Sequence, residues 1–142
     1  EKEEREKEER EKEEAKRIEK EKEQQHQRHH QLANDLIDFV GSEEFHDVQI
    51  FVGTPEVKLY GHKVILCSRN AKFREKISQY SGVVAKISYP EESEIGMRNV
   101  LAYLYGGQVP PVSTSKEEVA MTLKTARYFG VEELVSQLEG RK

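Results

Sequence analysis

The sequence has a single cysteine among its 142 residues and no long apolar run. One thiol excludes a disulfide within the chain. No segment reaches the roughly 18 consecutive apolar residues that a membrane-spanning helix needs, and the N-terminal residues lack the apolar core of a signal peptide. We therefore expect an intracellular protein, cytoplasmic or nuclear, with no membrane partner.

The charge balance does not indicate a nucleic-acid partner. The 23 Lys and Arg residues are outnumbered by 27 Asp and Glu residues, and the net charge is -4 at pH 7. Attraction to a phosphate backbone requires an excess of positive charge. A chain of this length suits one compact domain with a modest core, and most of its charge lies towards the N-terminus.

Residues 1–31 contain no glycine or proline, and Ala15 and Ile18 are their only apolar residues. The repeat "EKEER" places glutamates four residues before basic residues, as in Glu1 and Arg5, which is the favourable order for helical ion pairs. A coiled coil is disfavoured because there is no apolar seam to bury. We expect a single solvated helix, which acts either as a stiff spacer or as a partly frayed extension or linker.

Three histidines close this charged segment. His26, His29 and His30 fall on one face of a helix, a spacing that can hold zinc weakly. A zinc site needs a fourth ligand and a shielding fold, and the segment offers neither. We therefore predict no metal site and no cofactor.

From Leu32 onward the composition becomes that of a globular domain, which we assign to residues 32–140. Leu32, Leu36, Phe39 and Val40 follow helical spacing and predict an amphipathic helix. Gly41 can end that helix in a left-handed conformation.

Alternating apolar residues predict three strands. Residues 47–60 contain two alternating runs around the turn Gly53-Thr54-Pro55 and are expected to form a hairpin. Residues 62–77 change to helical composition and predict two short helices around Asn70. A third strand is expected before Pro90, and its alternating positions are Val83, Ala85, Ile87 and Tyr89.

The last third of the chain predicts three helices. An apolar stripe at Met97, Val100, Leu101 and Leu104 stops at Gly106-Gly107. Ser115 and Glu118 have the spacing of a capping box for the next helix, which Gly130 ends. A short final helix follows at residues 131–138. The order of elements predicts an α+β domain.

The chemistry of an enzyme is not evident in this sequence. No Cys-x-x-Cys, Gly-x-Gly-x-x-Gly or His-Glu-x-x-His pattern occurs. Cys67 would need a nearby base to act as a nucleophile, and His62 is the nearest histidine in the chain. Helical spacing instead places Cys67 on the face of Val64, where a free cysteine behaves as a small buried hydrophobe. We expect a core residue and no catalytic activity.

Four segments, in order, resemble the successive blocks of a BTB/POZ domain, and the similarity covers residues 32–140. They are the Phe-x-Asp-Val of Phe45 to Val48, the His-Lys before "VILCSRN", the "YLYGG" of Tyr103 to Gly107, and the pattern of Ala126 to Leu134. The resemblance implies a cluster of helices flanked by a short three-stranded sheet, preceded here by the charged helix.

The resemblance also implies a homodimer formed through the first helix and its neighbours. An apolar helical stripe needs a cover, and a symmetric partner supplies one. Asp47 and Lys63 match positions that line a charged pocket near the dimer centre, although Asp47 could equally tether its own strand. The dimer-forming residues would be Leu32, Leu36, Phe39 and Val40.

The resemblance implies two possible functions. The first is a protein–protein interaction module that mediates homodimerisation and partner recruitment within a larger multidomain scaffold or adaptor protein. The alternative is a substrate adaptor of a cullin-3 ubiquitin ligase. The family resemblance implies that such adaptors share a hydrophobic-x-Glu motif. The corresponding segment here is Tyr80-Ser81-Gly82, which has no glutamate. We therefore favour the general interaction module.

Overall fold

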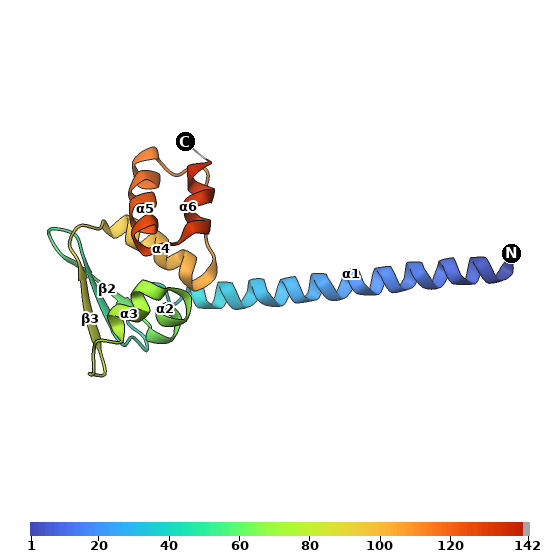
Figure 1. The fold of residues 1–142 in the computed structure, drawn as a ribbon, viewed down its shortest axis with the longest axis horizontal. Helices are drawn as coiled ribbons and strands as arrows, with labels where there is room; N and C mark the ends of the chain where they lie inside the picture. Colours follow the sequence, from blue (N-terminus) through green and yellow to red (C-terminus); the bar gives the residue numbers. More distant parts are fainter. Residues whose placement is uncertain (141–142) are drawn as a thin grey trace. The chain divides into compact units, whose positions relative to one another are not determined.

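The chain divides into two compact units in a computed structural model that describes residues 1–140. The first unit is Glu1–Asn34, and the second begins at Asp35. Helix α1 (Lys2–Ile37) contains the charged segment from Lys2 onward and has no buried residue (Figure 1). Within residues 1–140, no helix is both long and apolar enough to cross a membrane.

Helix α1 continues without a break from the charged segment into the first helix expected for the domain. It ends at Ile37, after which the N–H groups of Phe39 and Val40 bond to carbonyl groups three residues earlier. These tighter turns lead to Gly41, whose φ of 71° is left-handed. The conformation predicted for Gly41 is confirmed, but the helix ends several residues before it.

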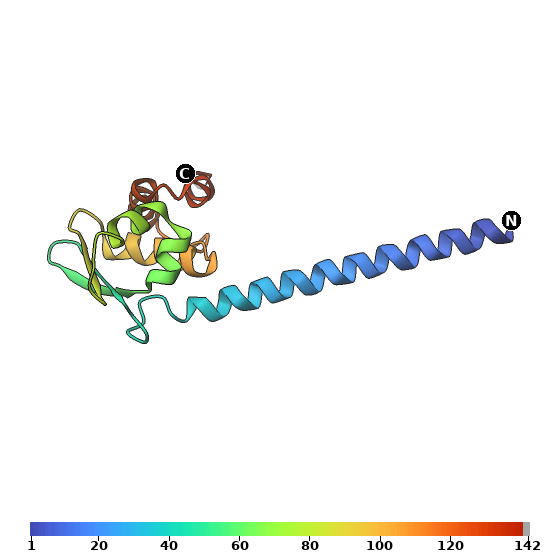
Figure 2. The ribbon, with the colours of Figure 1, turned by 60° about the horizontal axis from the view of Figure 1, so that its bottom comes forward.

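Three short strands form the sheet of the second unit, in the order β2-β1-β3. Strands β1 (Val48–Val52) and β2 (Val57–Gly61) are antiparallel, as the hairpin pattern predicts, while β3 (Ala85–Tyr89) runs parallel to β1. Burial alternates along β1 and β3, so one face of the sheet is covered. The helices that follow β2 in the second unit lie on that side of the sheet (Figures 1 and 2).

The prediction that Val83 belongs to the third strand is wrong. Strand β3 begins at Ala85, which is opposite Val48, the first residue of β1. The N–H of Ala85 bonds to the carbonyl of Asp47 at 2.9 Å. Val83 lies beyond the end of the neighbouring strand, and its side chain is 85% exposed.

Helices α2 (Lys63–Arg69) and α3 (Ala71–Ile77) are separated by Asn70, as the sequence predicts. The Asn70 side chain is buried and makes two hydrogen bonds. Its Oδ1 accepts from the Phe73 N–H at 3.1 Å, and its Nδ2 donates to the Phe129 carbonyl at 3.0 Å. One residue therefore caps α3 and ties it to a helix far along the chain.

The apolar face of α2 differs from the expected one. Leu66 is its only buried residue and packs against Gly61, where a Cβ atom would lie 2.9 Å from Leu66 Cδ1. Val64 was expected to share a buried face with Cys67, but its side chain is 76% exposed. Cys67 is half-buried and packs against the core, so only part of that prediction is confirmed.

Three further helices complete the second unit: α4 (Glu94–Gly106), α5 (Lys116–Phe129) and α6 (Glu132–Glu139). The predicted cap is confirmed at Ser115, whose side chain accepts from the Glu118 N–H. Gly130 ends α5 in a left-handed conformation with φ 70°. These helices and the sheet enclose a core in which the Phe73 ring stacks on that of Phe129 with centroids 4.3 Å apart.

Candidate interaction surfaces

The residues predicted for a dimer interface differ in their surroundings. Leu32 belongs to the first unit, and its side chain is 60% exposed. Leu36, Phe39 and Val40 belong to the second unit and are half-buried. Phe39 and Val40 pack against the core of their own domain, so each has only part of its surface available to a partner.

Phe45 is an exposed aromatic residue beside Phe39. The two ring centroids are 6.4 Å apart, and the Phe45 side chain is 85% exposed. Its φ of 57° is the only positive value at a non-glycine position in residues 1–140. Left-handed backbone is unfavourable for a bulky residue and persists only where surrounding contacts impose it. The fold therefore holds this ring outward.

His62 supplies one of those contacts. Its Nε2 lies 2.8 Å from the Glu44 carbonyl, directly before Phe45, and its Nδ1 lies 2.8 Å from the Tyr105 hydroxyl. A carbonyl only accepts, so in the neutral imidazole Nε2 carries the proton and Nδ1 accepts from the Tyr105 hydroxyl. Burial raises the pKa of Tyr105, which keeps its hydroxyl protonated as this arrangement requires. The histidine is a structural anchor at the end of the hairpin.

The hydrogen bonds of His62 also bear on the cysteine hypothesis. Both of its ring nitrogens are engaged, by Glu44 and Tyr105. The ring is consequently not the base that a nucleophilic Cys67 would require.

Asp47 and Lys63 lie together, but not as an ion pair. Asp47 Oδ1 accepts from the backbone N–H of Lys63 at 2.6 Å, while Lys63 Nζ donates to the Gly82 carbonyl at 3.3 Å. The carboxylate thus tethers the start of β1 to the first turn of α2. A charged pocket at a dimer centre involves a second chain and stays a prediction.

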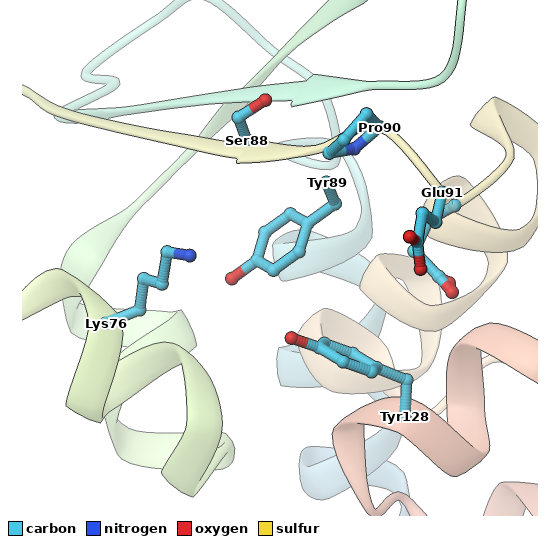
Figure 3. Close-up of a pocket in the computed structure, with 7 residues that line it drawn as sticks. Lys76, Ser88, Tyr89, Pro90, Glu91 and Tyr128 are labelled. Carbon is cyan, nitrogen blue, oxygen red and sulfur yellow. The ribbon is translucent and has the colours of Figure 1, made fainter.

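A second candidate surface lies at the end of β3. A cavity of about 190 Å³ opens there, between α3, the segment after β3 and α5 (Figure 3). The rings of Tyr89 and Tyr128 meet edge to face with centroids 6.0 Å apart. Burial, followed by the charges of Tyr128 and Tyr80, raises the pKa of Tyr89. The lining residues are Lys76, Ser88, Tyr89, Pro90, Glu91, Glu92 and Tyr128.

Two lysines of α3 cover the aromatic faces of this cavity. Lys72 Nζ lies 4.1 Å from the ring centroid of Tyr128, and Lys76 Nζ lies 5.3 Å from that of Tyr89. These are cation–π distances. A second cavity, of about 230 Å³, shares Lys76, Tyr89 and Tyr128 with the first and extends along α3.

Sequence reasoning missed both Phe45 and this cavity. Phe45 was recognised only as part of a motif, although a large apolar residue between Glu44 and His46, outside the strand alternation, is a signal of an exposed ring. The cavity joins segments that are far apart in the sequence and has no local signal.

Two of the three histidines predicted to share a face of α1 lie close together. The rings of His26 and His30 stack with centroids 6.5 Å apart. Over the part of the chain that the structure describes, no group of three His, Cys, Asp or Glu side chains is placed to hold a metal ion. The Phe45 surface and the cavity at the end of β3 therefore provide aromatic rings and charged side chains.

The fold is that of solved BTB domains. The BTB (Tramtrack and Bric a brac) domain of human gigaxonin superimposes with a TM-score of 0.63 and 21% identity, over 79% of this chain and 88% of that one. The BTB domain of zebrafish PATZ1 superimposes with a TM-score of 0.59 and 18% identity, over 80% of this chain and 86% of that one. The comparison with curated proteins gave no match.

Residues 36–141 match the BTB/POZ domain family, so the chain belongs to that family. The resemblance of the four sequence blocks and the predicted α+β fold are both confirmed. BTB/POZ domains are protein–protein interaction and dimerisation modules rather than catalytic domains.

Proposed function

We propose that this domain forms a homodimer and recruits partners for a larger scaffold or adaptor protein. The observation that carries the proposal is the exposed ring of Phe45 beside Phe39. Covering a phenylalanine side chain contributes about 1.5 to 3 kcal/mol, and a two-fold axis uses the same ring twice. Leu36 and Val40 belong to the same unit and are half-buried, so we include them as candidate residues of the interface.

The proposed dimer has a role for Asp47 and Lys63. One carboxylate oxygen of Asp47 is engaged by the Lys63 N–H. The other oxygen is the acceptor that we assign to a Lys63 ammonium across the dimer. Such a pair favours correct pairing more than affinity, because removing both charges from water offsets their attraction.

The dimer is tested by light scattering coupled to gel filtration. Phe45→Asp is expected to weaken dimerisation at least about tenfold, because it places a charge at the centre of the apolar contact. Val83→Asp is the matched control, since Val83 and Phe45 are both 85% exposed. A Phe45→Asp protein with the wild-type mass at every concentration would overturn the proposal.

Leu32 and Leu36 are tested in the same experiment. Leu36→Asp is expected to weaken the dimer. Leu32→Asp tests the one predicted interface residue that lies in the first unit. If both variants dimerise as the wild type does, the first helix does not form the interface.

The cullin-3 adaptor is the alternative form of partner recruitment. The place of the hydrophobic-x-Glu motif lies between α3 and β3, where the Tyr80 side chain is 40% exposed. Calorimetry with the N-terminal region of cullin-3 separates the two functions. Binding in the range of tens of micromolar or tighter, lost in Tyr80→Asp, would favour the adaptor; no heat of binding would favour another scaffold.

A further inference from the structure

The cavity at the end of β3 has opposite charges on its two sides. In Figure 3, Lys76 lies on one side of the Tyr89 ring and Glu91 on the other, and Tyr128 faces Tyr89. Its volume of about 190 Å³ is several times the roughly 30 Å³ that one water occupies in the liquid, and below the 300 Å³ or more of a small-molecule site. The space suits one inserted side chain.

Glu92 makes the acidic side of this cavity unusual. The residue lines the cavity but is only 6% exposed. Its Oε2 is shielded from solvent and is the one buried side-chain oxygen or nitrogen of residues 1–140 without a hydrogen-bond partner. A buried carboxylate without a partner is strongly unfavourable, so most such groups are paired.

Glu92 lies beside the N-terminus of α4. The residue precedes Ser93, the N-cap of α4, where the helix dipole stabilises a negative charge. The N–H of Gly96 is already bound by Ser93 Oγ at 2.9 Å, so it does not serve the carboxylate. Glu92 Oε2 thus has no hydrogen-bond donor, although the residue lies in the wall of the cavity.

The cations of the chain close to this site are engaged elsewhere. Lys124 Nζ donates to the Glu91 carbonyl at 2.8 Å. Lys72 and Lys76 cover the two tyrosine rings. The ion pairs of residues 1–140 do not include Glu92. Among residues 1–140, Glu92 Oε2 is therefore left without a cationic partner.

We propose that this cavity binds a basic side chain of a partner protein, with arginine preferred over lysine. Its charged end pairs with Glu92, and its aliphatic part lies against Tyr89 and Tyr128. Arginine is preferred because its planar guanidinium stacks on aromatic rings and is less strongly hydrated than an ammonium group. Lys76, on the opposite side, repels the cation and directs it towards Glu92.

An acidic ligand is the competing possibility on the α3 side of the same surface. There the second cavity is lined by Lys72, Lys76 and Gln79. Both lysines already contact aromatic rings, and Glu75 lies in the same wall, so the positive charge is partly compensated. The observations favour the basic ligand, and the experiment decides between the two.

The test uses the full chain with ¹³C-labelled tyrosine rings, titrated by NMR with N-acetyl-L-arginine amide. N-acetyl-L-norleucine amide and N-acetyl-L-glutamate amide are the neutral and acidic controls. The arginine probe is expected to shift the Tyr89 and Tyr128 signals saturably at millimolar concentration. The proposal is overturned if the norleucine probe gives the same shifts or if the glutamate probe binds more tightly.

Two glutamine variants locate the charge. Glu92→Gln keeps the shape of the side chain and is expected to weaken the arginine probe about fivefold, whereas the exposed neighbour Glu91→Gln changes it less than about twofold. Equal affinity for Glu92→Gln and wild type would contradict the assignment.

Tyr128→Leu tests the aromatic part of the site at a half-exposed position. It is expected to weaken binding of the arginine probe about threefold. Repeating the titration in Phe45→Asp separates this site from the dimer proposal, because binding there is expected to be unchanged.

Discussion

The Asp47 carboxylate binds the backbone of Lys63 rather than its ammonium group. The Oδ1 to N distance is 2.6 Å, and the ammonium donates instead to the Gly82 carbonyl. His62, the residue before α2, provides no side-chain cap. Asp47 therefore satisfies the first N–H of α2 from a position outside the helix, and its charge is favourable at a helix N-terminus.

Replacing Asp47 is expected to destabilise the single chain. Asp47→Ala leaves the Lys63 N–H without its acceptor, and we expect a loss of about 1 to 2 kcal/mol in the free energy of unfolding, measured with urea. Lys63→Met removes the charge and retains the N–H, so it is expected to change stability by less than about 0.5 kcal/mol. Equal losses for the two variants would show that the ammonium group matters to the monomer.

The bond between His62 and Tyr105 leads to a prediction at neutral pH. Tyr105→Phe leaves the buried Nδ1 of His62 without a donor, and we expect a loss of about 1 to 2 kcal/mol in urea unfolding at pH 7.5. Tyr80→Phe is the control, because that side chain is 40% exposed. If Tyr105→Phe is as stable as the wild type, the hydrogen bond makes no net contribution to the free energy of unfolding.

Tyr103 and Tyr105 also predict how stability changes at alkaline pH. Burial raises the pKa of Tyr105 above its ordinary value of 10.0, and burial together with Glu133 raises that of Tyr103 to about 12. Below pH 10 both states keep these protons. As the pH rises from about 10 to 12 the unfolded chain loses them first, so the folded state becomes less stable. In urea unfolding over this range, Tyr105→Phe should show a shallower fall than the wild type, and parallel curves would contradict the prediction.

Gly96 allows α4 and α5 to approach closely. A Cβ atom there would lie 2.8 Å from the Met121 carbonyl oxygen and still closer to Thr125 Oγ1. Gly96→Ala is expected to lower stability by about 1 to 3 kcal/mol, measured by thermal and urea unfolding. Gly82→Ala is the matched control, because its nearest neighbour would be 3.9 Å away. If Gly96→Ala is as stable as the control, the two helices separate without loss.

The charged part of α1 depends on local interactions. Glu6 and Arg10 approach to 4.0 Å with both side chains largely exposed, so salt screens their attraction. A peptide of residues 1–31 is expected to be helical by circular dichroism and less helical in 1 M salt. A peptide of the same composition without glutamates four residues before basic residues should be less helical at low salt. Equal helicity would attribute the helix to residue propensity alone.

The features that the sequence predicted correctly depend on neighbouring residues. The hairpin, the caps at Ser115 and Gly130, and the left-handed Gly41 follow from alternation, capping chemistry and glycine geometry. The charged helix follows from composition and ion-pair spacing. The family was recognisable because several such blocks occur in a fixed order.

The features that were missed depend on contacts between distant segments. Strand β3 begins where β1 begins, which excludes Val83, and the burial of Glu92 results from where the segment after β3 folds. His62 and Tyr105 are 43 residues apart, and no local pattern relates them. The sequence by itself determined the elements and the family, because backbone preferences act over a few residues. Only the tertiary structure decided that Phe45 is held outward and that Glu92 is buried without a partner, because exposure and pairing are set by whatever the rest of the chain places alongside.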